Sequence, residues 1–92
     1  MIVKFYATLR SIVGGKEVEI PVEPGATAKE LLDAIIAKYP ALKKELFQED
    51  GRLYGHVHMF INGRDVQFYA ENLEVKIGPE DVVTIFPAVG GG

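Results

Sequence analysis

The residues with the clearest chemical potential are the three glycines that end the sequence, Gly90, Gly91 and Gly92. Glycine has no Cβ, so the walls of a partner's active site can close around the backbone of such a segment. Residues 88–92 reach about 17 Å when extended, which lets them enter a narrow channel while the folded body docks outside. The carboxylate of Gly92 is unreactive toward nucleophiles at neutral pH. We therefore expect a separate enzyme to activate it with ATP as an acyl-adenylate.

The rest of the chain offers little chemistry of its own. The sequence contains no cysteine, which excludes thiolate metal sites and cysteine nucleophiles. It has no phosphate-binding loop of the G-x-x-x-x-G-K-[ST] type, so we expect the activation and its ATP to belong to the partner. We expect no permanently bound cofactor and no catalytic activity of the chain alone.

Three groups of polar side chains are weaker candidates for sites. His56 and His58 lie two residues apart on one strand face, but zinc takes three or four ligands, so two surface histidines are expected. Glu80 and Asp81 are adjacent and, in a strand, would point to opposite faces, so a turn is expected there. Ser11 is not flanked by the glycines of a nucleophile elbow.

Composition and net charge narrow the class of protein and its partners further. A chain of 92 residues with 48% hydrophobic and 25% charged residues is typical of one globular domain. The net charge of −3 disfavours nucleic acid as a partner, because phosphate binding requires a basic face, and Lys43-Lys44 is expected to be a solvated helix face. No leader peptide and no apolar run long enough to span a membrane is found, so we expect a cytoplasmic protein without membrane partners.

Hydrophobic periodicity and turn residues predict the elements that position the tail. Gly14-Gly15 predicts a tight turn between the first two strands, Thr27-Ala28-Lys29-Glu30 is a helix capping box, and Asn62-Gly63 predicts a hairpin turn. The expected elements are strands over 1–8 and 16–22, a helix over 27–39, a short helix over 41–47, and strands over 56–61, 66–68 and 82–86.

This order predicts an α+β fold in which one main helix packs on one face of a mixed sheet of four to five strands. Strand alternation assigns an inward, apolar face and an outward face to each strand. The expected inward residues are Val3, Phe5, Val18, Ile20, Val57, Met59, Ile61, Val83 and Ile85. The expected outward residues are Ile2, Lys4, Tyr6, His58, Phe60, Thr84 and Phe86.

Three segments carry a resemblance to a known family: residues 5–10 (FYATLR), residues 61–64 (INGR) and residues 78–92 (GPEDVVTIFPAVGGG). Together they resemble the MoaD/ThiS group of ubiquitin-like sulfur carriers, and best the small subunit of molybdopterin synthase. The resemblance covers essentially the whole chain. It implies one β-grasp domain over 1–92 with a flexible C-terminal tail over 88–92, and it places the last strand between the first and the third.

The resemblance also implies a function. An E1-like adenylating enzyme would activate Gly92, with Gly91 as its obligatory neighbour, and the acyl-adenylate would be converted to a thiocarboxylate. The sulfur would then pass to a precursor held by the molybdopterin synthase large subunit or by another acceptor enzyme, so that catalysis needs both subunits. The alternatives are a ubiquitin-like protein modifier, or a sulfur carrier for thiamine, cysteine or tRNA thiolation.

Strand parity combined with this sheet order predicts where partners dock. Tyr6, Phe60 and Phe86 should be neighbours on the outer face of the sheet, beside the point where the tail leaves. A contiguous exposed apolar patch beside a functional end is typical of an interface. We therefore expect partner contacts from these three aromatic residues and from the tail residues Pro87, Val89 and Gly90.

Overall fold

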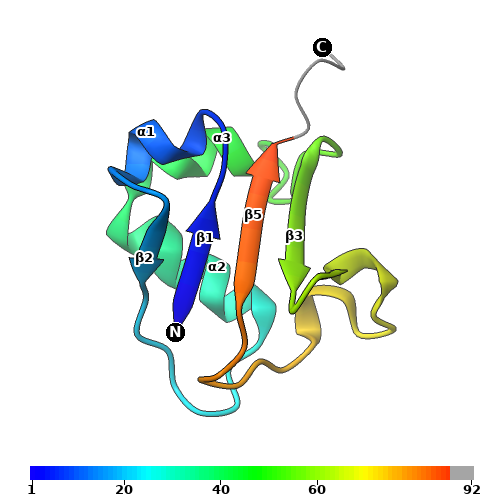
Figure 1. Ribbon diagram of the computed structural model, residues 1–92. Helices are drawn as coiled ribbons and strands as arrows, with labels where there is room; N and C mark the ends of the chain where they lie inside the picture. Colours follow the sequence, from blue (N-terminus) through cyan, green and yellow to red (C-terminus); the bar gives the residue numbers. More distant parts are fainter. Residues whose placement is uncertain (88–92) are drawn as a thin grey trace.

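The structure is a computed structural model and describes residues 1–87. It has the expected α+β architecture, a five-stranded sheet with the main helix on one face (Figure 1). The strands lie in the order β2-β1-β5-β3-β4. The strands are β1 Ile2–Phe5, β2 Glu17–Glu19, β3 Val57–Ile61, β4 Arg64–Asp65 and β5 Val83–Pro87, and the helices are α1 Leu9–Val13, α2 Ala28–Lys38 and α3 Lys43–Leu46.

Strand β5 lies in the middle of the sheet. It runs parallel to β1, with Phe5 opposite Ile85, and antiparallel to β3, with His58 opposite Phe86. The last strand therefore lies between the first and the third, as expected. Strand β5 ends at Pro87, which lies opposite Val57 of β3, whereas its pairing with β1 ends at Ile85.

Helix α2 begins where the sequence predicts. The Thr27 hydroxyl accepts a hydrogen bond from the Glu30 backbone N–H at 3.1 Å, and the Glu30 carboxylate accepts one from the Thr27 N–H at 2.9 Å. This reciprocal pair satisfies two of the free backbone donors at the helix start. Pro40 follows the helix and begins the 3₁₀ turn Pro40–Leu42, which leads into α3. The short helical segment expected over 41–47 is thus confirmed.

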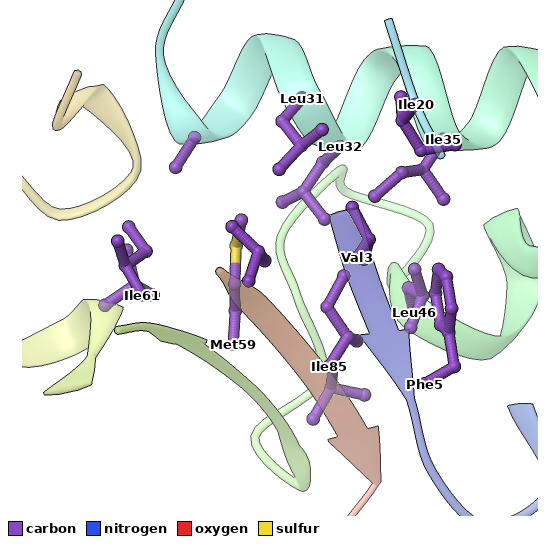
Figure 2. Packing of buried hydrophobic residues seen from close by; sticks show 14 of the residues in the cluster. Val3, Phe5, Ile20, Leu31, Leu32, Ile35, Leu46, Met59, Ile61 and Ile85 are labelled. Carbon is purple, nitrogen blue, oxygen red and sulfur yellow. The ribbon is translucent and has the colours of Figure 1, made fainter. Parts of the chain in front are cut away.

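The core lies between α2 and the inner face of the sheet. Leu31, Leu32 and Ile35 of α2 are fully buried and face Val3 and Ile85 of the central strands (Figure 2). The expected inward residues of β1, β3 and β5 are all buried, which confirms their parity. Within residues 1–87, no helix combines the length and the apolar character that a membrane crossing requires.

The expected strand over 1–8 is wrong beyond Phe5. The chain turns at residues 6–8 and forms α1, which ends at Gly14 with a left-handed φ of 83°. The helix forms because Leu9 and Val13, one turn apart on the same side, are both buried in the core. Strands β1 and β2 still pair antiparallel, but a helix connects them and not the tight turn expected from the glycines.

The expected strand over 66–68 is also wrong. Strand β4 ends at Asp65, and Val66–Phe68 form a 3₁₀ turn. The cause is the Asp65 side chain, which accepts a hydrogen bond from the Gln67 backbone N–H at 3.0 Å and so caps the turn. Such local bonds from Asp to the backbone compete with continued strand pairing.

The hairpin turn before β4 is as expected and also anchors the start of β5. Asn62 and Gly63 have φ values of 51° and 86°, the left-handed pair that a two-residue hairpin needs. The Asn62 amide accepts from the Val82 N–H and donates to the Asp81 carboxylate, both at 2.9 Å. Asp81 accepts a further bond from the Gly78 N–H at 2.7 Å, which closes the turn expected before the last strand.

Candidate functional site

Of the sequence-predicted site residues, Val89, Gly90, Gly91 and Gly92 lie outside the described residues. Pro87 is the last described residue and ends β5, opposite Val57. The structure thus gives the surroundings from which the tail begins, namely the outer face of the sheet and the ends of β1 and β5. We define the site by these surroundings.

Phe86 is the centre of an aromatic cluster on the outer face. The Phe60 ring stacks on it at 5.3 Å between centroids with 6° between planes, and the His58 ring stacks at 5.3 Å with 29°. Tyr6 approaches edge-on at 6.4 Å and 78°. We call these four residues the aromatic face. Its members come from β5, from β3 and from the segment just after β1, so the expected meeting of Tyr6, Phe60 and Phe86 is confirmed.

The aromatic face is accessible from outside. Tyr6 is 42% exposed, and Phe60, Phe86 and His58 are half-buried. Helix α2 lies on the opposite side of the sheet (Figure 1). Aromatic pairs in these geometries attract one another beyond their buried area, so the cluster is a preorganised apolar surface beside the origin of the tail.

A small cleft continues the aromatic face at the end of β5. It is lined by Tyr6, Ala7, Thr84, Phe86 and Pro87, and its volume is about 470 Å³. Its lining is almost entirely apolar. We call it the tail cleft, because Pro87, the residue before the tail, is one of its walls.

Arg10 contacts Tyr6, which forms one wall of the tail cleft. Its Nε donates a hydrogen bond to the Phe5 carbonyl at 2.8 Å, and its guanidinium carbon lies 4.6 Å from the centroid of the Tyr6 ring. The guanidinium is thus held over the Tyr6 ring as a cation–π pair. Sequence reasoning did not assign this role. The signal was available in the spacing of Tyr6 and Arg10, but it required knowing that a helix starts between them.

A second polar contact missed by sequence reasoning lies behind the aromatic face. His58 Nδ1 lies 3.1 Å from Asp65 Oδ2, and Gln67 donates to the same carboxylate through its side-chain amide at 3.1 Å as well as through its backbone. Burial raises the pKa of Asp65, but the hydrogen bonds from Gln67 and His58 outweigh it and hold the pKa below its ordinary value. Asp65 is therefore ionised at neutral pH and accepts the His58 Nδ1 proton.

His56 and His58 have different surroundings. His56 precedes β3 and stacks on Tyr54 at 5.1 Å, whereas His58 is bound to Asp65. Among the described residues, no three side chains of ligand type gather closely enough to hold a metal ion.

A larger hollow of about 780 Å³ lies on the helical side, between α2 and the segment after α3. Its rim mixes Lys29, Lys43 and Lys44 with Asp33 and Glu49. Lys43 and Lys44 are exposed, as expected for a solvated helix face. The hollow has no connection with the end of β5. The smaller tail cleft is therefore the better candidate for function.

Comparisons with known proteins identify the family of the chain. A family model described as the ThiS family matches residues 3–92. Small archaeal modifier protein 1 of Haloferax volcanii is 34% identical over 89 residues, which cover 97% of each chain. Its crystal structure has a TM-score of 0.86 to this fold and covers 100% of this chain and 98% of its own.

Two further solved structures are similar over nearly the whole chain. One is a chain in the crystal structure of the Amycolatopsis orientalis BexX/CysO complex, at 34% identity and a TM-score of 0.81, covering 99% of this chain and 98% of that one. The other is a candidate molybdopterin converting factor subunit 1 from Pyrococcus furiosus, at 30% identity and a TM-score of 0.76, covering 96% and 95%. From the sheet order, the family match and these relatives, the chain belongs to the ThiS family of ubiquitin-like, β-grasp sulfur carriers and small protein modifiers.

Proposed function

We propose that the chain is a sulfur carrier whose C-terminal Gly92 is activated by an E1-like adenylating enzyme and loaded with sulfur. The single observation that carries the proposal is the aromatic face. Its central ring, Phe86, immediately precedes Pro87 at the origin of the tail, on the strand that lies between β1 and β3. A docking surface fixed this close to the tail can direct residues 88–92 into a partner's active site.

The proposed chemistry has two steps. In the first, a Gly92 carboxylate oxygen attacks the α-phosphorus of ATP, a P–O bond is formed, and pyrophosphate leaves. In the second, a hydrosulfide-equivalent nucleophile attacks the acyl carbon of the adenylate and forms a C–S bond. The C–O bond to the phosphate breaks, and AMP leaves with the bridging oxygen that came from the Gly92 carboxylate. The product is the Gly92 thiocarboxylate. Gly91 contributes by leaving room for the partner's walls around the acyl group.

The described residues support docking but not activation. The outer face provides apolar rings in fixed orientations, which are favoured as anchors of protein interfaces. ATP and the sulfur donor are thus substrates of the partner, and the chain supplies the acyl group and the surface that places it.

Within this function, we propose the molybdopterin pathway as the destination of the sulfur. The support is the resemblance of the tail segment to the molybdopterin synthase small subunit and the similarity to the Pyrococcus furiosus candidate converting factor. The partner in that case is the synthase large subunit, and the assembled synthase is the catalyst. Sulfur delivery for cysteine is the next candidate, because the chain in the BexX/CysO complex is similar at 34% identity and a TM-score of 0.81.

Protein modification is the second candidate function, favoured by the similarity to small archaeal modifier protein 1. The adenylation of Gly92 is common to the carrier and the modifier functions. The two functions differ in the nucleophile that displaces AMP, which is sulfur for a carrier and a lysine amine for a modifier. One chain with one activated carboxylate can serve both.

The test is intact-mass spectrometry of the purified chain after incubation with ATP, a sulfide source and the E1-like enzyme encoded by the same genome. A mass gain that corresponds to exchange of one oxygen for one sulfur is expected for a carrier. Peptide fragmentation should place the change on Gly92. Covalent adducts between Gly92 and lysine, without the exchange, would indicate a modifier only, and an unchanged mass would contradict both functions.

A further inference from the structure

We infer that the chain associates with a second copy of itself through the larger hollow on the helical side. The Phe68 ring of one copy sits in the hollow of the other, and Glu71 and Glu74 beside that ring pair with the lysines on the rim. The contact uses neither the tail nor the aromatic face, so it goes beyond the proposed function and does not depend on it.

The first half of the contact is an exposed aromatic side chain between β4 and β5. Phe68 is 67% exposed, the highest fraction among the large hydrophobic side chains of residues 1–87. It ends the first of two successive 3₁₀ turns, Val66–Phe68 and Asn72–Glu74. Figure 1 shows this segment in yellow, beyond β3 at the edge of the sheet. We call Phe68, Glu71 and Glu74 the knob.

The backbone that carries the Phe68 ring is held in place. Arg64 Nη2 donates a hydrogen bond to the Phe68 carbonyl at 2.8 Å, and the Arg64 guanidinium carbon lies 4.8 Å from the centroid of the Tyr69 ring. The Tyr69 hydroxyl donates to the Ile61 carbonyl at 3.4 Å. These contacts tie the turn to β3 and β4, so the ring is presented with little ordering left to be done on binding.

The second half of the contact is the hollow between α2 and the segment after α3. Its volume of about 780 Å³ is in the range of about 300–1,000 Å³ that ligand sites have. Ile36, Phe47 and Tyr54 give its lining an apolar part. Residues 47–53 form one wall and fold back on themselves through backbone hydrogen bonds at 2.7 and 3.0 Å. Phe68 does not line the hollow of its own chain.

The charges on the rim select the occupant of the hollow. Lys29 pairs with Asp33 at 2.9 Å, so these two charges offset each other. Lys43 and Lys44 are exposed, and within residues 1–87 neither takes part in a salt bridge. Glu49 is the remaining charged residue of the lining. The rim therefore has an excess of positive charge and favours an occupant that combines an apolar group with carboxylates.

The knob has that combination. Glu71 and Glu74 are exposed, and within residues 1–87 neither takes part in a salt bridge. The knob thus brings one ring for the apolar lining and two carboxylates for the two lysines. Since the chain itself supplies both halves of the contact, the occupant is a second copy. Two copies can exchange knobs in a closed dimer or link head to tail, and both assemblies contain the same contact.

The experiment is sedimentation velocity of the full chain over a concentration series that extends to the millimolar range, at low and at high salt. One ring and two exposed ion pairs make a small interface, so the association should be weak and reversible, and salt should weaken it. A wild-type chain that stays monomeric at every concentration overturns the inference. The measurement requires neither ATP nor the adenylating enzyme, so that result would leave the proposed function untouched.

The ring is tested by Phe68→Ser, which should raise the dissociation constant about tenfold or more, the effect of a lost anchor. Ile2→Ser is the matched control. It removes an apolar side chain that is 38% exposed from β1, which β5 and β3 separate from β4 and the knob, and it should change the dissociation constant by no more than about twofold. Thermal melting shows that each variant is folded. Folded Phe68→Ser that associates like the wild-type chain overturns the inference.

The charges are tested by reversal. The double variant Lys43→Glu/Lys44→Glu and the double variant Glu71→Lys/Glu74→Lys should each associate more weakly than the wild-type chain. The chain that combines all four substitutions should regain association, because unlike charges face each other again. A fourfold variant no better than the two double variants would show that these residues do not pair.

Mixing two blocked chains tests the contact directly. The Phe68→Ser chain keeps its hollow, and the Lys43→Glu/Lys44→Glu chain keeps its knob. An equimolar mixture should therefore sediment faster than either chain alone at the same total concentration. A mixture that sediments like its separate components overturns the inference, since the knob and the hollow then serve other partners.

Discussion

His58 Nδ1 and Asp65 Oδ2 lie 3.1 Å apart, and this contact ties the aromatic face to a buried charge. Within residues 1–87, Asp65 is the only buried polar or charged residue, at 7% exposure. The ionised carboxylate accepts the Nδ1 proton, which fixes the tautomer and orientation of the ring. Because His58 stacks on Phe86, the placement of this ring on β5 depends on an acid on β4, two strands away in the sheet.

The first prediction is that Asp65→Asn destabilises the protein by about 1–2 kcal/mol at pH 7, because it weakens hydrogen bonds to a charged, buried acceptor. The folded-state pKa of Asp65 lies below its ordinary value. Its contribution to stability is therefore fully present above about pH 4, the unfolded pKa of aspartate, and is lost as the pH falls through the lower folded pKa. Urea unfolding at pH 7 and pH 3 should show the difference between the two proteins shrinking at low pH.

The control for Asp65 is Asp33→Asn. Asp33 pairs with Lys29 on the exposed side of α2 at 2.9 Å, and exposed pairs of this kind contribute little, up to about 0.5 kcal/mol. If Asp65→Asn and Asp33→Asn have the same small effect, or if the effect of Asp65→Asn is the same at both pH values, the buried contact has no role in stability.

The second prediction separates two contributions at Asn62. Asn62→Ala removes the hydrogen bonds to Val82 and Asp81 and also places a Cβ residue without a local hydrogen bond at a φ of 51°. Asn62→Gly removes the same bonds without the steric strain. We expect Asn62→Ala to be less stable than Asn62→Gly by about 1 kcal/mol, the scale of left-handed strain. Equal free energies of unfolding in urea would show that the turn carries no strain.

Much of this fold can be predicted from the sequence, because local signals agree with the tertiary structure. The capping box of Thr27 and Glu30 and the Asn62-Gly63 turn each depend on residues a few positions apart. Strand alternation placed the inward residues of β1, β3 and β5 and the outward Phe86 correctly, since a buried face forces a period of two. The sheet order followed from the family resemblance and not from the residues alone.

The elements that were mispredicted depend on contacts that no local pattern specifies. Leu9 and Val13 are spaced for a helix of α1 length, but such a short helix forms only because both side chains enter the core. The strand expected over 66–68 was replaced by a turn because the Asp65 carboxylate captures the Gln67 N–H. The roles of Arg10 and Asp65 at the aromatic face depend on the same two elements, so they could not be predicted until those elements were known.

The third prediction is that deletion of Gly91 and Gly92 abolishes sulfur loading and leaves the fold unchanged. The reason is that glycine has no side chain to bury, and the core cluster of the described residues 1–87 ends at Ile85. Thermal melting and intact mass after loading should be measured on the same preparation. A truncated chain that still acquires sulfur at its new terminus would contradict the proposed role of Gly92.

The last prediction compares two phenylalanines on opposite faces of neighbouring strands. Phe5 is fully buried, at 0% exposure, whereas Phe86 is half-buried at the centre of the aromatic face. Phe5→Ala should destabilise the protein by about 3–5 kcal/mol, the cost of a large cavity in a core. Phe86→Ala should cost clearly less stability, because it leaves an opening to solvent and no enclosed cavity.

For binding to the adenylating enzyme, Phe86→Ala should have the larger effect of the two substitutions. Phe86→Ala should weaken the affinity for the adenylating enzyme, measured by calorimetry, by about 2 kcal/mol or more, because the lost ring is an anchor that also holds His58, Phe60 and Tyr6 in place. Phe60→Ala, which removes a peripheral ring of the same face, should weaken binding less than Phe86→Ala. Melting temperatures of Phe5→Ala and Phe86→Ala are measured alongside. If Phe86→Ala unfolds the domain as severely as Phe5→Ala, or if it binds the enzyme as tightly as the wild-type chain, the aromatic face is part of the core and not a docking surface.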